Sequence, residues 1–438
     1  MKKFLITLLI ITGVIFSHSA DFYYNFDKTI GKKGKGQAEF DYPVDITRDN
    51  YGNMYVTDWK NNRVQKFSEE GNYIQEFGNQ AAPKLSLPIG IDSDNDNNIY
   101  VVDYGNHRVI KYDQNGNLLL TIGKQGRANG EFRSPRGIFV DKKGANIYVA
   151  DHDNNRIQVF SKSGDFVQEI RCFDPENGKF YPPRAVAKDN NNNLYVVFTQ
   201  YNNIWKINHK GEILLKFGQK GTKPGEFDGP RYIAVDILDN LYVSDYNNNR
   251  IQIFNTEGNC KAYFGEKGSN AGAFNRPEGI VVDKTGDVFI VDAENHRIQI
   301  FKSSDEMRNR SLAKFYASIN NMEEAYNYYV KVFESDKNNT IAKKFILDYL
   351  VETLKKEKVD ENIKIIATEI LEIDNTEVEA HKALDTIREK ELQAQWRKKV
   401  RLIIVLLIVI IAVIILVIVL KPAKPKKGQD KKNKVIIW

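Results

Sequence analysis

The stretch PRGIFVDKKGANIYVADHDNNRIQVF, residues 135–160, is the unit from which most of this 438-residue chain is built. It recurs as PRYIAVDILDNLYVSDYNNNRIQIF at residues 230–254 and as PEGIVVDKTGDVFIVDAENHRIQIF at residues 277–301. The prolines that open the copies lie 45, 47, 48, 47 and 47 residues apart, at Pro43, Pro88, Pro135, Pro183, Pro230 and Pro277. Self-similarity at a fixed period is the signature of a repeat architecture, so the sequence predicts six copies of one structural unit.

Each copy has the pattern of four short strands separated by polar turns. In the third copy the strands are predicted at residues 137–141, 146–150, 156–161 and 166–170. Short strands rich in β-branched and aromatic residues form antiparallel sheets, and sheets repeated at this period stack radially as the blades of a propeller. The predicted fold is an all-β propeller of six blades over residues 21–304.

The two ends of the repeat region predict how the ring closes. The sixth copy lacks a fourth strand, whereas residues 29–43, TIGKKGKGQAEFDYP, match residues 121–135, TIGKQGRANGEFRSP, at eight of fifteen positions. The segment before Pro43 therefore has the sequence of a fourth strand, although no first three strands precede it. We expect this N-terminal strand to complete the last blade, which removes the exposed sheet edge of an open ring.

The pattern P-x-G-I-x-V-D, then N-I-Y-V-x-D-x-x-N-x-R-I-Q-x-F, resembles the NHL repeat over about 285 residues. The resemblance implies a six-bladed propeller. It implies no single activity, because propellers similar to NHL proteins serve as binding platforms and, in some relatives, as lyases or lactonases.

The element D-x-x-N-x-R recurs in five of the copies. An Asp that ends one strand and an Arg that starts the next can form a charge-assisted pair that pins the turn between them. A structural role is therefore predicted for the pairs Asp58 and Arg63, Asp103 and Arg108, Asp151 and Arg156, Asp245 and Arg250, and Asp292 and Arg297. The fourth copy departs from this rule, since Phe198, Tyr201 and Asn203 stand at the triad positions.

Residues that follow the opening prolines should surround one mouth of the central channel, on the face that we call the top. Three adjacent copies place an arginine there, and the loops between the second and third strands bring aromatic residues to the same face. Arginine with aromatic faces suits anionic or planar ligands. The predicted ligand-binding residues are Arg136, Arg184, Arg231, Phe198, Tyr201, Tyr181, Trp59, Tyr104 and Tyr246.

The segments outside the propeller predict a targeting signal and a membrane anchor. Residues 1–20 have a basic start, an apolar core and small residues at the end, which is typical of a signal peptide. Residues 305–399 have a helical period and resemble a degenerate tetratricopeptide array, that is, a stalk of paired helices. Residues 400–420 predict a single transmembrane helix, and residues 421–438 a basic cytoplasmic tail, with everything before the span extracytoplasmic.

These observations favour a membrane-anchored binding or scaffold protein over an enzyme. The expected partner is a protein or a cell-envelope glycan rather than nucleic acid, and the stalk offers a face for homo-oligomerisation. No catalytic residue, cofactor or metal site is predicted, since the channel positions lack His and the acidic run at residues 92–96 departs from a calcium loop. The alternative is a metal-dependent hydrolase or lyase, similar to a lactonase, acting in the channel.

Overall fold

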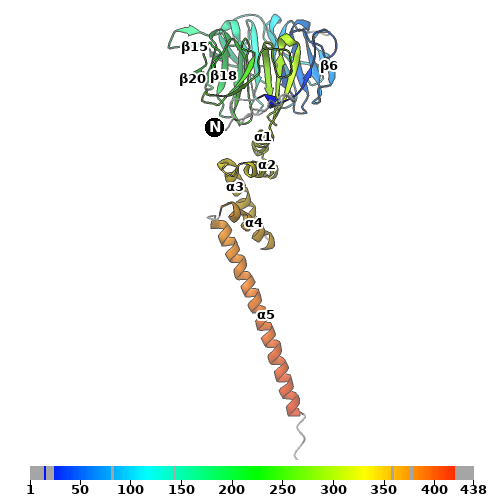
Figure 1. Cartoon of the computed structure of the whole chain (residues 1–438), viewed down its shortest axis with the longest axis vertical. Helices are drawn as coiled ribbons and strands as arrows, with labels where there is room; N and C mark the ends of the chain where they lie inside the picture. Colours follow the sequence, from blue (N-terminus) through cyan, green and yellow to red (C-terminus); the bar gives the residue numbers. More distant parts are fainter. Residues whose placement is uncertain are drawn as a thin grey trace, which may run out of the picture. The chain divides into compact units, whose positions relative to one another are not determined.

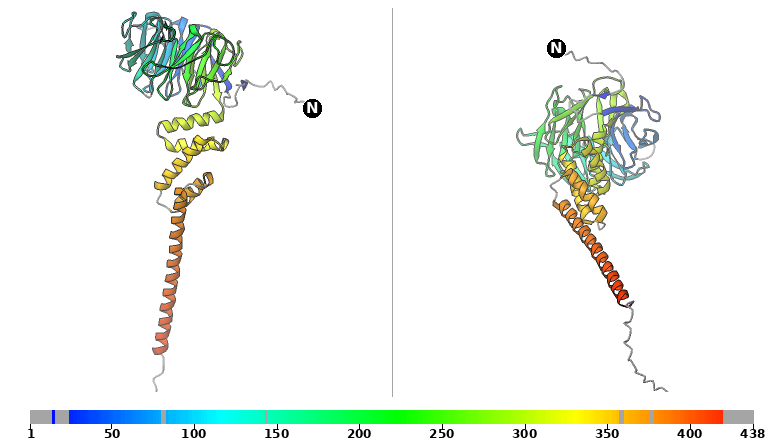
Figure 2. Two further views of the ribbon diagram at one scale, coloured as in Figure 1. Left: turned by 90° about the vertical axis from the view of Figure 1, so that its left-hand side faces the viewer. Right: turned by 60° about the horizontal axis from the view of Figure 1, so that its bottom comes forward.

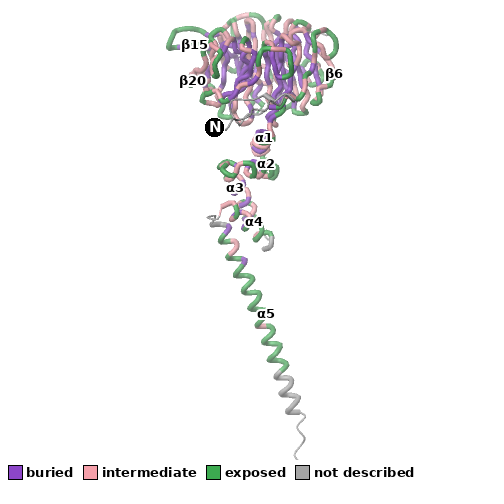
Figure 3. The backbone as a smooth tube through the Cα atoms, viewed as in Figure 1, coloured by how far each residue is buried: buried purple, intermediate pink, exposed green. Residues whose placement is uncertain are grey.

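The repeating unit folds into antiparallel four-stranded blades. In the third copy, strands β11 (Pro135–Val140), β12 (Asn146–Asp151), β13 (Arg156–Ser161) and β14 (Phe166–Arg171) pair in chain order. The computed structural model describes residues 14–15, 24–79, 83–142, 144–356, 360–374 and 378–419, without the side chains of 14–15, 360–361, 378–379 and 410–419. Buried residues concentrate in the middle strands, which have a blade on either side (Figure 3).

Four further blades have the same strand order (Figure 1). The first two consist of β3 (Pro43–Arg48), β4 (Met54–Asp58), β5 (Arg63–Phe67) and β6 (Tyr73–Phe77), then β7 (Pro88–Ser93), β8 (Ile99–Asp103), β9 (Arg108–Tyr112) and β10 (Leu118–Ile122). The fourth and fifth consist of β17 (Ala185–Lys188), β18 (Leu194–Phe198), β19 (Asn203–Ile207) and β20 (Ile213–Phe217), then β21 (Pro230–Val235), β22 (Leu241–Asp245), β23 (Arg250–Phe254) and β24 (Cys260–Phe264).

The last blade is closed by the N-terminal strand, as the sequence predicts. Its sheet has the order β2 (Tyr24–Ile30), β27 (Arg297–Ser303), β26 (Val288–Asp292) and β25 (Pro277–Val282), and β1 (Val14–Ile15) adds to β2. Tyr24 lies opposite Ser303, and Ile30 lies opposite Ile298. The ring therefore has six blades and joins its two ends within one sheet.

Residues in the left-handed conformation join neighbouring blades on the top face. Asn62 and His107 follow the short 3-10 helices η1 (Trp59–Asn61) and η2 (Tyr104–Asn106), with φ of 54° and 55°. Each accepts a hydrogen bond from a backbone N–H of the next blade, Asn62 Oδ1 from Leu87 at 2.7 Å and His107 Nδ1 from Ser134 at 3.0 Å. Asn and His tolerate positive φ better than most residues, which explains their use at these turns.

The first helix lies on the bottom face, where β27 ends (Figures 1 and 2). Helix α1 (Asp305–Ser318) begins at Ser304, whose side chain caps it by accepting from the N–H of Met307. Met307 is buried, and its sulfur accepts a hydrogen bond from Tyr24 of the closing strand at 3.3 Å. Lys314 pairs with Asp239 of the fifth blade at 3.2 Å. The chain thus leaves the propeller on the side opposite the arginine positions.

The helices divide between two units of the chain, one ending at Asn339 and the other starting at Thr340. The first unit ends with α2 (Met322–Ser335), which packs on α1 with Tyr316 and Tyr328 stacked at 5.6 Å. The second contains α3 (Thr340–Lys356), α4 (Asp360–Ile373) and α5 (Val378–Val419). These are the helices predicted after the propeller; their likeness to tetratricopeptide repeats stays a prediction.

Three predicted segments fall wholly or partly outside the described residues. They are the signal peptide at 1–20, of which residues 14–15 are described as β1, the basic tail at 421–438, and side chains 410–420 of the predicted span at 400–420. Within the described part of the chain, the structure contains no helix with both the length and the apolar character needed to cross a membrane. The predicted transmembrane helix is therefore not found.

Candidate functional site

The five Asp–Arg pairs form the same contact in each blade that carries them. Arg63 Nε donates to Asp58 Oδ2 at 2.8 Å, and Asn61 donates to the same oxygen at 2.9 Å. The other pairs have Nε–Oδ2 distances of 2.7–2.8 Å, at Arg108 and Asp103, Arg156 and Asp151, Arg250 and Asp245, and Arg297 and Asp292. All five aspartates are completely buried, so these residues belong to the interior of the blades.

These pairs also hold the loops of the top face. Asp151 Oδ1 accepts from the backbone N–H of Arg133 at 2.8 Å, two residues before the opening proline. Arg156 Nη2 donates to the carbonyl oxygens of Ala128 and Glu131 at 2.7 and 3.0 Å. The pair therefore fixes the loop that leads into the inner strand, and with it the residue after the proline. The role of the pair in the structure is therefore to position this loop.

The fourth blade replaces the ion pair with an aromatic cluster. Phe198 and Trp205 lie 4.5 Å apart, and Tyr181 packs on them at 5.5 and 4.6 Å. Tyr181 and Phe198 were predicted to bind ligand, but both are buried. Phe198 stands at the position of the interior aspartate, and Tyr181 packs on Phe198 and Trp205. Tyr201 is the exposed member, with 37% of its surface accessible, and stacks on Tyr181 at 4.0 Å.

An exposed aromatic pair projects beside this cluster, on the hairpin of β15 (Phe173–Asp174) and β16 (Lys179–Phe180), which Figure 1 shows at the edge of the propeller. The rings of Phe173 and Phe180 lie 5.0 Å apart and are 38% and 48% exposed. The hairpin lies between the fourth strand of the third blade and Pro183, where the sequence pattern predicted no strands.

Two of the three predicted arginines lie beside a buried glutamate. Arg184, 5% exposed, donates from Nη2 to Glu278 Oε2 at 2.9 Å, and Arg231 Nε lies 3.9 Å from Glu278 Oε1. Glu278 is 2% exposed and holds the position after the proline in the sixth blade. Arg136 is partly exposed and has no ion pair among the residues described. Arg184 is thus an interior residue, which the sequence did not reveal.

Each of the three arginines stacks on a tyrosine ring. The guanidinium of Arg136 lies 5.4 Å from the ring centre of Tyr104, that of Arg184 5.4 Å from Tyr232, and that of Arg231 4.2 Å from Tyr246. Two of the three rings, Tyr104 and Tyr246, were predicted for this face. Such stacking holds a guanidinium by its flat face, so its N–H edge remains available for hydrogen bonds.

Trp59, the remaining predicted residue, lies next to this group through Tyr42. The rings of Trp59 and Tyr42 are 5.5 Å apart, and the Tyr42 and Tyr246 hydroxyls are hydrogen-bonded at 2.7 Å. The structure thus brings the three arginines together with Tyr104, Tyr246 and Trp59, whereas Tyr181 and Phe198 are buried in the aromatic cluster of the fourth blade.

The inner strands approach one another closely below the arginines. A Cβ atom on Gly137 would lie 2.7 Å from the Cα of Ala185, and one on Gly279 2.6 Å from the Cα of Asp45. The fifth blade carries Tyr232 at this level, where other blades have Gly, Ala or Asp, and its side chain is buried. A bulky residue at a position otherwise held by small ones was the signal that sequence reasoning missed.

Burial and charge shift the protonation of the groups around the arginines. The pKa of Arg136 falls to about 10 because of burial and the neighbouring charge of Arg184. Burial would also lower the pKa of Arg184, but Glu278 outweighs it and raises that pKa. The pKa of His152 falls to about 4 through burial and the charge of Arg136, so this imidazole is neutral at neutral pH.

The shift of His152 predicts a pH dependence of stability. Its folded pKa of about 4 lies below the ordinary 6.5, so the unfolded chain binds the proton preferentially. Stability from this group is complete above about pH 6.5 and falls towards pH 4, by at most ~3 kcal/mol. We expect His152→Gln to reduce the loss of unfolding free energy between pH 7 and pH 4.5, measured by urea denaturation. The exposed His209→Gln is the control, and an equal acid-side loss in wild type and His152→Gln would contradict the account.

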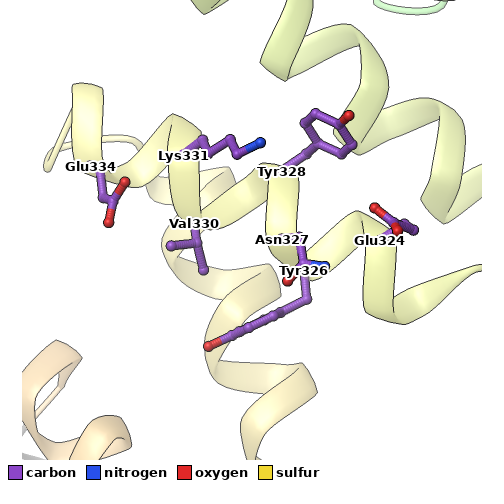
Figure 4. Close-up of a pocket in the computed structure, with 7 residues that line it drawn as sticks. All are labelled: Glu324, Tyr326, Asn327, Tyr328, Val330, Lys331 and Glu334. Carbon is purple, nitrogen blue, oxygen red and sulfur yellow. The ribbon is translucent and has the colours of Figure 1, made fainter.

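Other candidate sites in the described residues are a metal-binding group, the acidic run at residues 92–96 and a shallow pocket. No group of three or more His, Cys, Asp or Glu side chains there is arranged to hold a metal ion. Asp94, in the acidic run at 92–96, accepts hydrogen bonds from Asn98 and Tyr100 and so holds a hairpin. A shallow pocket lies along α2 (Figure 4), lined by Glu324, Tyr326, Asn327, Tyr328, Val330, Lys331 and Glu334.

Two family models match parts of the propeller. The NHL repeat model matches residues 40–67, 227–254 and 274–301, and a model described as a 6-bladed beta-propeller matches residues 90–210. With the closed ring of sheets, these matches show that the chain carries NHL repeats in a six-bladed β-propeller. Among curated proteins, none matches the sequence.

Solved structures resemble the propeller at low sequence identity. A protein of unknown function from Bacteroides thetaiotaomicron is 17% identical, with a TM-score of 0.50 over 64% of this chain and 76% of its own. A streptogramin B lyase is 18% identical (TM-score 0.46; 65% and 98% covered). A gluconolactonase from Xanthomonas campestris is 14% identical (0.49; 67% and 96%). At these identities the likeness concerns the fold alone.

Proposed function

We propose that the propeller is a binding module whose top face recognises a protein or a cell-envelope glycan. The observation that carries this proposal is the group of three arginines stacked on tyrosines at the channel mouth, with one glutamate beside Arg184 and Arg231. Arginine on aromatic rings is a common element of recognition surfaces. The five Asp–Arg pairs would keep this surface in place without contacting the partner.

Partner capture by a charge-reversed surface tests this proposal. Arg136→Glu with Arg231→Glu changes partly exposed residues and leaves the buried Arg184–Glu278 pair intact. We expect this double variant to lose capture of envelope components in a crosslinking pull-down with little change in melting temperature. The matched control is Arg171→Glu with Lys210→Glu, because both side chains are exposed and neither contacts the arginines and tyrosines of the channel mouth. Undiminished capture by the first variant would refute the proposal.

We further propose that the propeller acts outside the cytoplasm, with residues 402–420 as its anchor. The support is in the sequence: nineteen apolar residues without a break, between Arg401 and Lys421, and a start typical of a signal peptide. Carbonate extraction of cell membranes should leave the chain in the pellet, and its release would contradict the anchor. The hydrolase or lyase alternative stays a prediction, which stoichiometric divalent metal in the purified protein would favour.

A further inference from the structure

We propose that the arginines at the channel mouth form an oxyanion site, which holds a carboxylate or phosphate group of the ligand that the top face binds. This inference rests on the proposed binding function and names the chemical group that its site recognises. We call Arg136, Arg184, Arg231, Tyr232 and Glu278 the mouth cluster. Four members lie on the inner strands β11, β21 and β25, and Arg184 directly precedes β17, so the site joins four blades and exists only in the closed ring.

The mouth cluster contains buried hydrogen-bond donors that have no acceptor within the described part of the chain. The Nε atoms of Arg136, Arg184 and Arg231 are buried and have no hydrogen-bond partner among the described residues. The hydroxyl of Tyr232 is in the same condition. Buried donors in native proteins are almost always paired. Four unpaired donors in one cluster therefore indicate acceptors supplied from outside the chain.

The mouth cluster carries an excess of positive charge. Arg184 and Arg231 share one carboxylate, Glu278, and Arg136 adds a third positive charge. The nearby Asp45 accepts from the N–H groups of Ile46 and Ile91, and burial raises its pKa well above the usual range, which disfavours a second negative charge there. A further carboxylate, Asp153, is held by Ser134 Oγ at 2.6 Å and His152 Nδ1 at 2.7 Å. Arg276 is balanced by Glu294 at 3.2 Å. The uncompensated charge is one to two units, which matches one carboxylate or one phosphate group.

Arg136 forms no ion pair among the described residues. Its pKa is lowered to about 10, first by burial and then by Arg184, which means that the like charges of the cluster repel one another. Arg184 differs, because Glu278 raises its pKa against the effect of burial. A bound oxyanion would stabilise the charged form of Arg136, as Glu278 stabilises that of Arg184.

The surrounding structure determines how a ligand enters. Arg136 and Arg231 are partly exposed on the top face, whereas Arg184, Glu278 and Tyr232 are buried beneath. Below them the inner strands are too close for even a Cβ atom at Gly137. A single anionic group can therefore reach the cluster from the top, while the rest of the ligand lies on the rim of tyrosine rings.

Titration calorimetry on the full-length protein tests the site with inorganic phosphate, the sugar acid galacturonate and the neutral sugar galactose. We expect phosphate, galacturonate or both to bind and galactose not to bind; the anion that binds identifies the group. Arg136→Gln should weaken binding about ten- to hundredfold, as the loss of a charge-assisted hydrogen bond does. Its melting temperature without anion should be unchanged or higher, because repulsion within the cluster is relieved.

Arg171→Gln is the matched control, since it removes the same charge from an exposed side chain and should bind as wild type does. Equal anion affinity in wild type and Arg136→Gln would overturn the oxyanion site, as would no binding of either anion or equal binding of galactose. The proposed binding function would survive these results if the charge-reversed surface still failed to capture its partner. If anions bind at the mouth cluster but partner capture does not depend on Arg136 and Arg231, the proposed binding function is refuted and the oxyanion site is not.

Discussion

A chain that begins at Gly31 should not form a cooperative native state. This truncation removes β2, so β27 loses its partner strand and the ring loses its closing contact. Tyr24 and Ile30 are buried, and the Tyr24 hydroxyl is hydrogen-bonded to Tyr242 of the fifth blade at 2.7 Å. An unpaired edge next to an exposed core promotes aggregation. Thermal unfolding followed by near-ultraviolet circular dichroism should show no cooperative transition.

A chain that begins at Asp21 is the control, because it keeps the whole of β2. The single change Tyr24→Ala should cost about 3–5 kcal/mol of unfolding free energy, as other large aromatic deletions in cores do. A synthetic peptide of residues 24–30 should restore the transition of the truncated chain by adding the missing strand. A cooperative transition in the truncated chain without the peptide would show that closure by β2 is dispensable.

Asp151→Ala should destabilise the propeller by about 3–5 kcal/mol, measured by urea unfolding. The carboxylate accepts four described hydrogen bonds, from Arg156, Asn154, Gln158 and the backbone of Arg133. Arg156 is itself buried, so the substitution leaves an unpaired charge in the interior. Asp165→Ala on an exposed hairpin is the control and should change stability by less than ~1 kcal/mol.

The fourth blade makes a further test of the pair possible. It has Phe198 and Asn203 at the positions of Asp151 and Arg156 and holds its turn by aromatic packing instead. Asp151→Ala combined with Arg156→Met should therefore be more stable than Asp151→Ala alone, because no buried charge remains unpaired. If the double variant loses as much as the sum of the single variants, the two residues do not act as a pair.

The propeller could be predicted from the sequence because the residues that define each blade are close together in the chain and recur in six copies. Six copies of one pattern defined the strands of each blade, and the match of residues 29–43 to residues 121–135 defined the closing strand. The Asp–Arg contact was equally accessible, since its two residues are five apart across one turn. Each of these features depends on neighbours in the chain or on the repeat itself.

The candidate site was harder to predict because it joins residues far apart in the chain. Glu278 and Arg184 are 94 residues apart in the sequence, and no pattern near either residue predicts that they pair. Phe198 was assigned to the surface because it is aromatic and breaks the pattern. The alignment of Phe198 with the interior aspartates predicts its burial better, since the aligned position is buried in the other five blades and also in the fourth.

Site-specific photo-crosslinking of the full-length protein tests most directly whether recognition lies at the channel mouth. A photoreactive residue would replace Asn247 in a top loop, Ser163 in a bottom hairpin or Leu119 on an outer strand, each of them exposed. The account predicts attachment of the partner from position 247 and none from positions 163 and 119. Attachment from position 163 or 119 without attachment from 247 would contradict it.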